Sequence, residues 1–212
     1  MSTNSLKKAS IAAGAAGLMA ETADTAQAKG VDELIAGIKS DNAEERTEAW
    51  QSAGKVGAPA VKSLAKVMMD DELEVARAAK RALWQIVRYT GRPGADKEKS
   101  AVETELIRLL GDEQPVAVQR EVLWTLSEIG ARRSIKPIAG LLRNEELRED
   151  ARMALERIPG NQAVDALKAG FEAASEDFKP NIAQSLQKRG EEVAGYPSRK
   201  LIPTKKTDVK PL

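Results

Sequence analysis

Three pairs of neighbouring acidic residues have the type and spacing that chemistry could use: Glu44-Glu45, Asp70-Asp71 and Glu145-Glu146. Two adjacent carboxylates can share a proton in acid–base catalysis or bind a divalent cation. Each pair, however, stands where the apolar pattern predicts that a helix begins. Acids at a helix start cap free backbone N–H groups and interact favourably with the helix dipole. We therefore expect these pairs to be structural, and we predict no catalytic residue and no metal site.

The sequence contains no cysteine and no histidine. Without cysteine there can be no disulfide, no thiolate nucleophile and no cysteine-ligated zinc or iron–sulfur site. Without histidine the chain lacks the most common general base near neutral pH and the most common transition-metal ligand. The phosphate-binding pattern Gly-x-x-x-x-Gly-Lys-Ser/Thr is also missing. The sequence therefore favours a non-catalytic protein without a cofactor.

The composition is that of a soluble helical domain. The chain has 212 residues, of which 42% are apolar, 31% charged and only 3% aromatic. This length suits one domain with tails. A core made mainly of Ala, Leu, Ile and Val favours closely packed helices over a β-sandwich.

Charge is distributed unevenly along the chain. The whole chain has a net charge of +1, whereas residues 196–212 carry five basic residues against Asp208, a net of +4. Residues 1–28 are balanced, which leaves residues 29–195 with a net charge of −3. Prolines oppose helix formation in the C-terminal segment. We expect residues 196–212 to form a basic flexible tail, and the acidic body to repel a long polyanion.

Residues 1–28 differ from the rest of the chain. Lys7 and Lys8 precede an Ala/Gly-rich apolar run over residues 9–20, and the segment ends on Ala26-Gln27-Ala28. A basic start, a short apolar stretch and a small-x-small ending are typical of a secretory signal peptide. The run is too short for a transmembrane segment, which needs about 20 residues. We expect cleavage after Ala28 and export to the bacterial periplasm or another extracytoplasmic space. A disordered arm on a cytoplasmic protein is the alternative.

From residue 31 onward, apolar residues recur with a period of about 30 residues. Within each half of the period they are three, four or seven residues apart, which places them on one helical face. Neither helix of such a pair can bury its apolar face alone, so the units must stack on one another. We predict an all-α fold over residues 29–195: a right-handed α-solenoid of about four to five helical pairs with flexible termini. The aligned first helices of the four complete units begin their pattern at Ala49, Ala79, Val122 and Ala151.

Short patterns mark the turn inside each pair. Stretches of the form Ala-x-x-x-Ala/Leu-x-x-Val/Ile-Gly end at Gly57 and Gly130, and each is followed by Val/Ile-x-x-Leu/Ile. In these features residues 31–190 resemble the HEAT repeat family in its short bacterial form. Pro159 replaces the turn glycine of the fourth unit, and Arg189 replaces an aliphatic residue of the last. The units are shorter than usual HEAT repeats, so armadillo-like and tetratricopeptide arrangements remain alternatives.

The resemblance implies that the second helices line a concave binding face. In our alignment, cations occupy the outward columns of the three central second helices, whereas Asp32, Ala36, Asp165 and Glu172 take these columns at the two ends. We expect a central basic patch that binds an acidic protein surface. The alternative is that these charges only solvate the surface of the helices. The candidate residues are Lys62, Lys66, Arg108, Lys136 and Arg143.

Residues 88–100 have no counterpart in the other units and form an insertion. Its Gly91-Arg92-Pro93-Gly94 sequence indicates a turn. Inserted loops of solenoids often bind partners because the scaffold tolerates them, so Tyr89 and Arg92 are candidate binding residues. A plain elongated loop is the alternative. Trp124 is a further candidate, since it occupies a usually polar column and indoles are frequent binding hot spots. The alternative for Trp124 is packing under Tyr89 and the insertion.

Together these observations favour a non-catalytic protein-binding scaffold or accessory subunit that uses its concave face, inserted loop and tail. Nucleic-acid binding through the basic patch and tail is a first alternative, which the net negative body opposes. A phycobilin-lyase-like factor is a second, and only the resemblance implies it, because short HEAT repeats occur in such lyases. Deoxyhypusine hydroxylase also has HEAT repeats, but it depends on His-Glu metal motifs that this chain lacks.

Overall fold

The computed structural model describes residues 29–111 and 113–197. These residues form helices joined by turns, and they contain no strand. The predicted signal peptide and residues 198–212 of the predicted tail lie outside the described residues.

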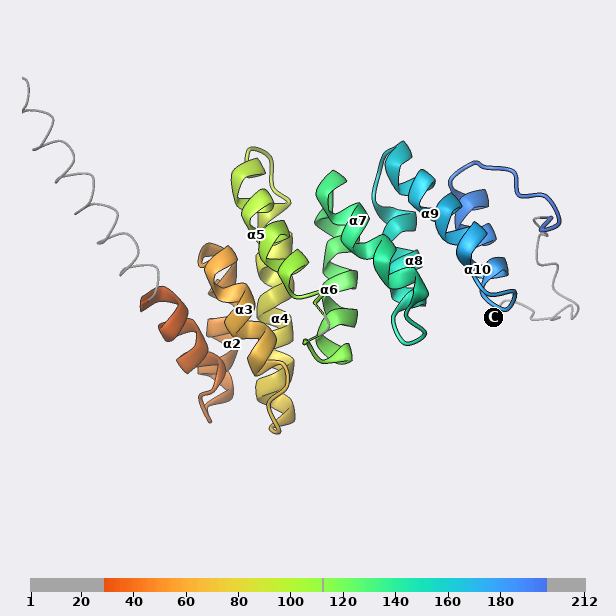
Figure 1. Ribbon diagram of the computed structural model, residues 1–212. Helices are drawn as coiled ribbons and strands as arrows, with labels where there is room; N and C mark the ends of the chain where they lie inside the picture. The colour runs from red at the N-terminus through yellow and green to blue at the C-terminus, as the bar shows by residue number, and fades with distance from the viewer. Residues whose placement is uncertain (1–28, 112, 198–212) are drawn as a thin grey trace, which may run out of the picture.

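The helices form pairs that follow one another in a row (Figure 1). An initial helix covers residues 29–38. The first helices of successive pairs are α2 (Ala43–Ser52), α4 (Leu73–Thr90), α6 (Val116–Ile129), α8 (Arg148–Arg157) and α10 (Lys179–Lys188). The second helices are α3 (Val61–Val67), α5 (Asp96–Arg108), α7 (Arg132–Gly140) and α9 (Asn161–Ala173). Short 3-10 turns are η1 (Ala53–Lys55), η2 (Ala58–Ala60) and η3 (Leu141–Arg143).

Each first helix packs against the next first helix, and each second helix packs against the next second helix. The stack therefore has two layers, which we call the first-helix layer and the second-helix layer. The predicted α-solenoid is confirmed, and the described residues contain four complete pairs between a leading second helix and a trailing first helix.

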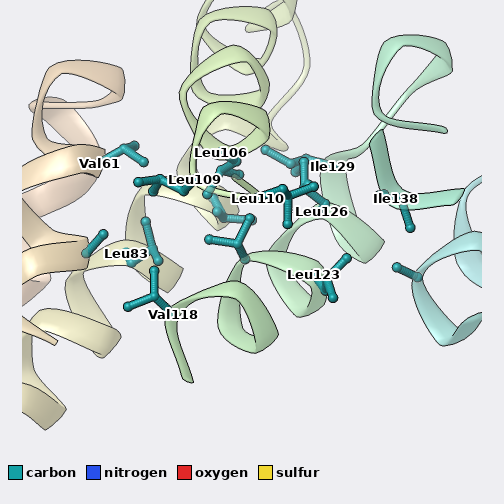
Figure 2. Close-up of a cluster of buried hydrophobic side chains, with 14 of the residues drawn as sticks. Val61, Leu83, Leu106, Leu109, Leu110, Val118, Leu123, Leu126, Ile129 and Ile138 are labelled. Carbon is teal, nitrogen blue, oxygen red and sulfur yellow. The ribbon is translucent and has the colours of Figure 1, made fainter. Parts of the chain in front are cut away.

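A continuous apolar core lies between the two layers. Leu83 of α4, Leu106 of α5, Leu126 of α6 and Ile138 of α7 are all completely buried. Figure 2 shows these side chains within one cluster drawn from several helices. Burial of each such side chain contributes about 1.5–3 kcal/mol to folding. The core thus joins consecutive pairs. This is expected for a repeat protein, because a single unit cannot bury its apolar faces alone.

Glycines make the sharp turns that the sequence predicted. Gly57 and Gly160 precede second helices with φ of 71° and 97°, a left-handed conformation that side chains disfavour. Gly130 ends α6 for another reason, because a Cβ there would lie only 2.4 Å from the carbonyl oxygen of Leu126. In the fourth unit Pro159 stands just before Gly160, so the turn keeps its glycine one residue later.

The segment 88–100 differs from the long loop that the sequence led us to expect. α4 continues to Thr90 and α5 begins at Asp96, so only residues 91–95 connect them. Arg92 stabilises this short turn: it donates a hydrogen bond to the carbonyl of Tyr89 at 2.8 Å and pairs with Glu98 at 2.6 Å. The insertion therefore mainly lengthens the two helices, and the prediction of an inserted loop is wrong for most of its residues.

The C-terminal boundary of the folded body also differs from the prediction. The predicted flexible tail includes Tyr196, but the Tyr196 ring packs edge-on against Phe171 with centroids 5.4 Å apart. Gln187 of α10 donates a hydrogen bond to the Tyr196 carbonyl. Tyr196 therefore belongs to the folded body.

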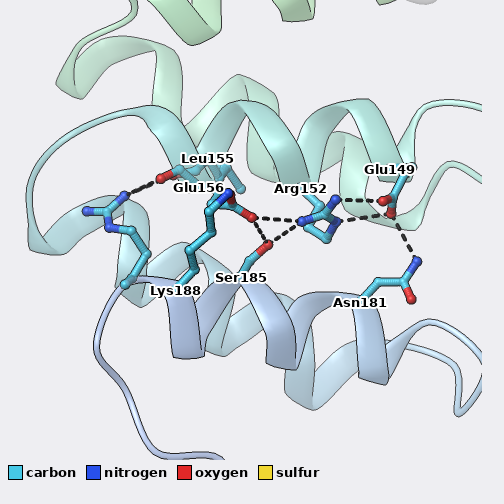
Figure 3. Close-up of polar contacts among 8 residues, drawn as sticks. Glu149, Arg152, Leu155, Glu156, Asn181, Ser185 and Lys188 are labelled. Atoms are coloured by element: carbon cyan, nitrogen blue, oxygen red, sulfur yellow. Dashed lines mark hydrogen bonds and ion pairs between the residues drawn. The ribbon is translucent and has the colours of Figure 1, made fainter. Parts of the chain in front are cut away.

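Polar side chains join α8 to α10 (Figure 3). The central group is Glu156, which accepts hydrogen bonds from Arg152 at 3.0 Å and Ser185 at 2.7 Å and pairs with Lys188 at 2.6 Å. Arg152 also pairs with Glu149 at 2.6 Å. This network crosses between helices and fixes their relative position.

Arg189 lies just beyond α10 and contacts the end of α8. Its guanidinium donates to the carbonyl oxygens of Leu155, Glu156, Ile158 and Gly160 at 2.7–3.2 Å. The last carbonyls of a helix have no partner within the helix. Arg189, which departs from the aliphatic repeat pattern, therefore satisfies the C-terminal end of α8.

Candidate protein-binding site

The five cations predicted to bind a partner lie on the second-helix layer and in η3, and all are exposed. Lys62 and Lys66 are on α3, and Arg108 is the last residue of α5. Lys136 is on α7, and Arg143 ends η3. Within the described residues only Arg108 forms an ion pair, with Glu105 of its own helix. The other four therefore keep charges that a partner can use.

Lys136 and Arg143 line a common groove between α7 and α9. The groove has a volume of about 590 Å³, and small residues from both helices form much of its lining. The 3-10 turn η3, which follows α7, also approaches α9 closely, since a Cβ at Gly170 would lie 2.4 Å from Leu142 Cδ1. The groove exists because residues such as Gly140 and Ala166 do not fill it. We call it the α7–α9 groove.

A third cation of the α7–α9 groove, Arg148, is neutralised within the chain. Its guanidinium lies 4.7 Å from the ring centroid of buried Phe178 and pairs with Asp177 at 2.7 Å. Hydrogen bonds from Ser175 and Arg148 hold the pKa of the Asp177 carboxyl below its ordinary value. Asp177 is therefore ionised at neutral pH and offsets the charge of Arg148.

The residues of the α7–α9 groove have the chemistry to bind carboxylates. Its two free cations can form charge-assisted hydrogen bonds with carboxylates, and its small-residue floor admits an extended chain. Across the residues that the structure describes, no group of three or more acidic side chains is placed to hold a metal ion. In the same part of the chain, no helix has the length and apolarity needed to cross a membrane.

Tyr89 and Arg92 are used within the fold. The guanidinium of Arg92 lies 3.9 Å from the centroid of the Tyr89 ring. Tyr89 in turn packs against Gly54, where a Cβ would lie 2.7 Å from Tyr89 Cβ. These two candidates therefore stabilise the turn between α4 and α5, and the structure does not bring them to the α7–α9 groove.

Trp124 is not packed under Tyr89 and the insertion, the alternative that the sequence left open. It is 40% exposed on α6, in the first-helix layer. It is therefore accessible to a partner, but from a different layer than the five cations.

Sequence reasoning missed a second set of residues, on the exposed side of α4. With Trp50 of α2, the α4 residues Arg77, Lys80, Arg81, Trp84 and Arg88 line a hollow of about 550 Å³. We call it the α4 hollow. The signal was present in the sequence, because positions 77, 81, 84 and 88 follow the spacing of one helical face.

Comparisons with known proteins identify no family. Neither a protein-family model nor a curated protein matches the chain. The stacked pairs by themselves make it a helical repeat protein.

Several of the similar solved structures are engineered proteins. A designed armadillo repeat protein in complex with the peptide (KR)4 is 19% identical with a TM-score of 0.42, and the match covers 73% of this chain and 80% of that one. An engineered protein is 20% identical with a TM-score of 0.40, covering 74% and 78%. Another designed armadillo repeat protein is 16% identical with a TM-score of 0.35, covering 74% and 98%.

Proposed function

We propose that this chain is a non-catalytic, HEAT-like scaffold or accessory subunit that binds an acidic segment of a partner protein in the α7–α9 groove. The observation that carries the proposal is the pair of exposed cations, Lys136 and Arg143, beside a floor of small residues, in a lining whose cations outnumber its one acid, Glu145. Neither cation has an acidic partner among the described residues. A carboxylate of the partner can therefore bind them without breaking an internal ion pair.

The remaining cations of the second-helix layer support this proposal at longer range. Lys62, Lys66 and Arg108 lie on neighbouring helices of the same layer as Lys136. A row of like charges attracts an acidic partner and speeds its association, and salt screens this attraction. The guanidinium of Arg143 can also bind a carboxylate with two parallel hydrogen bonds.

The HEAT-like assignment forms part of this proposal. It is supported by the turn glycines at Gly57 and Gly130 and by the period of about 30 residues. Stacked helical pairs of this kind expose extended surfaces, which suits binding rather than reaction chemistry.

The test compares two double charge reversals of equal size. Lys136→Glu with Arg143→Glu changes the α7–α9 groove, whereas Lys55→Glu with Lys97→Glu changes exposed cations outside it. Tagged full chains are used to capture native partners, which are identified, purified and measured for association rate at several salt concentrations. We expect the groove variant to associate at least tenfold more slowly at low salt, and the difference to shrink as salt rises.

Two results would contradict this function. Equal association of both double variants would show that the α7–α9 groove does not bind the partner. Nucleic acid that copurifies with the wild-type chain and is lost from the groove variant would favour nucleic-acid binding instead.

We further propose that residues 1–28 direct export and are removed. The proposal is supported by Lys7 and Lys8, the apolar run over residues 9–20 and the ending Ala26-Gln27-Ala28. N-terminal sequencing of the native protein should find Lys29 as the first residue. Cytoplasmic protein that still begins at Met1 or Ser2 would overturn it.

A further inference from the structure

The exposed side of α4 carries an unusual concentration of arginine and tryptophan. Arg77, Arg81, Trp84 and Arg88 are four, three and four residues apart, so they form a stripe along one face of the helix. Trp50 from α2 and Lys80 complete the α4 hollow, whose lining consists only of cations and indoles. A surface that only needed to be solvated would not require two indoles among its cations.

The cations of the α4 hollow differ in their ion pairs. Arg77 pairs with Glu74 at 2.8 Å, and Lys80 pairs with Glu121 of α6 at 2.5 Å. Within the described residues, Arg81 and Arg88 form neither an ion pair nor a side-chain hydrogen bond. These two arginines therefore keep all of their hydrogen-bonding capacity.

Both arginines are nevertheless held in place by aromatic rings. The guanidinium of Arg81 lies 5.9 Å from the ring centroid of Trp50, and that of Arg88 lies 5.5 Å from the ring centroid of Trp84. Trp84 is itself fixed, because its indole N–H donates a hydrogen bond to the buried carboxylate of Glu121. A stacked guanidinium loses less conformational entropy when a ligand binds it, and its N–H edge stays available.

From this arrangement we infer that the α4 hollow is a second binding site, for an extended acidic segment of a partner protein. Carboxylates of the segment bind the N–H edges of Arg81 and Arg88, which the indoles of Trp50 and Trp84 hold in position. The arginines are seven residues apart on one helix, which corresponds to about 10 Å. A polyproline II chain places every third residue on one face at intervals of about 9 Å. An acidic residue at every third position therefore matches the two arginines.

A peptide fits the α4 hollow better than a nucleic acid. Proteins that bind single strands stack bases on open aromatic faces, but here Arg81 and Arg88 lie over the two rings.

The α4 hollow belongs to the first-helix layer and shares no lining residue with the α7–α9 groove. Its occupation is therefore independent of the proposed function. The two can also fail independently, because each is tested with variants of its own lining residues.

The experiment measures binding of the peptide Glu-Pro-Pro-Glu-Pro-Pro-Glu to the full chain, by fluorescence anisotropy of a label on the peptide. The double substitution Arg81→Gln with Arg88→Gln should weaken the affinity of the chain for the peptide by about tenfold or more, because charge-assisted hydrogen bonds are lost. Arg81→Lys with Arg88→Lys keeps the charge but loses the flat stacked fork, and it should weaken binding by a smaller factor. Circular dichroism must first confirm that each variant is folded.

The matched controls change one feature at a time. The peptide with Gln in place of Glu should bind far more weakly, because it has no carboxylate. The Arg132→Gln variant removes an exposed arginine of the second-helix layer and should bind the acidic peptide like the wild type. No binding of the acidic peptide, or equal weakening by Arg132→Gln, would overturn the inference. Tighter binding of an oligothymidine of equal charge, lost on the same substitutions, would also overturn it in favour of nucleic acid.

Discussion

The two layers of the solenoid treat their charges differently. In the first-helix layer, ion pairs among the described residues join every two neighbouring helices from α4 to α10. In the second-helix layer, four of the five candidate cations have no ion pair among the residues described. The joining pairs are Lys80–Glu121, Arg120–Asp150, Arg157–Glu128 and Lys188–Glu156.

This difference gives a criterion for function that charge alone does not. Surface helices always carry charged residues, so a basic patch by itself has little meaning. A cation that neighbouring helices already use contributes to the stack, whereas a cation without a partner is available to a ligand. By this criterion Arg81 and Arg88 are exceptions within the first-helix layer, and for this reason the α4 hollow stands out.

The two layers share one core, so the largest expected effect on stability comes from removing a side chain of that core. Leu126→Ala removes a completely buried side chain of α6 and should lower the free energy of unfolding by about 2–5 kcal/mol. Leu73→Ala is the control, since Leu73 is 60% exposed and its loss should cost less than about 0.5 kcal/mol. Urea denaturation measures both. Two separate transitions in the wild-type protein would contradict a shared core.

The second-helix layer has one strong polar joint, and its removal should have the next largest effect. Glu103 of α5 is buried and accepts hydrogen bonds from the Ala131 N–H at 2.8 Å and the Ser134 hydroxyl at 2.6 Å. Glu103→Ala leaves these donors without a partner and should cost about 1–3 kcal/mol in urea denaturation. Arg133 also pairs with Glu103 at 3.0 Å but is half exposed, so Arg133→Ala should cost less than about 1 kcal/mol. Equal costs would mean that the ion pair, rather than the buried hydrogen bonds, stabilises this joint.

A smaller effect is expected at the α7–α9 groove itself. Gly140 has helical backbone angles, and a Cβ there would meet no atom within 4 Å. Gly140→Ala should therefore raise the free energy of unfolding by about 0.5–1 kcal/mol, because it restricts the unfolded chain. The added methyl group also narrows the groove, so partner affinity should fall while stability rises. A gain in stability with unchanged affinity would indicate that the partner does not occupy the groove floor.

The smallest effect on overall stability should be a local response of α10 to acid. A hydrogen bond from Arg152 holds the pKa of Glu149 below its ordinary value. Burial raises the pKa of Glu156, but hydrogen bonds from Lys188 and Ser185 outweigh it and the pKa is lowered. A carboxyl with a lowered folded-state pKa stabilises the fold above its unfolded pKa of about 4.3, and this stabilisation is lost as the pH falls through the lowered value.

Hydrogen exchange between pH 6 and pH 3 measures this response, once the intrinsic exchange rates are taken into account. The amides of α10 should lose protection at a higher pH than those of α6. Glu149→Gln with Glu156→Gln should weaken the pH dependence in α10 and leave α6 unchanged. Simultaneous loss of protection in both helices, unaffected by the substitutions, would show that the network at α8 and α10 does not set the acid response.

The fold could be predicted from the sequence because its evidence is local. Apolar residues three, four and seven apart define each helix, and the repeat period implies stacking. The long loop at 88–100 is a wrong prediction, because a segment without a counterpart in the other units can extend the helices instead of forming a loop. Asp96 and Glu98 in the first turn of α5 were the overlooked sign that a helix begins there.

Other features join residues that no local pattern relates. Tyr89 packs on Gly54, and Arg189 binds backbone carbonyls of the preceding unit. A carbonyl oxygen has the same chemistry at every position, so the sequence does not show which one an arginine will bind. The spacing of the arginines and Trp84 on one face of α4 can be seen in the sequence. The contact of Arg81 with Trp50, which lies on another helix, can be seen only in the structure.

The joint at Glu103 also bears on the order in which the units assemble. Units of similar size and apolar pattern could stack in the wrong sequence during folding, as repeat proteins are prone to do. If α5 met α9 in place of α7, alignment of the helices would bring Gln162 and Ala163 to the positions of Arg133 and Ser134. Glu103 would then be buried without its hydroxyl donor and without its cation, which is strongly unfavourable. The buried carboxylate of Glu103 thus favours stacking of the third unit, rather than the fourth, on the second unit.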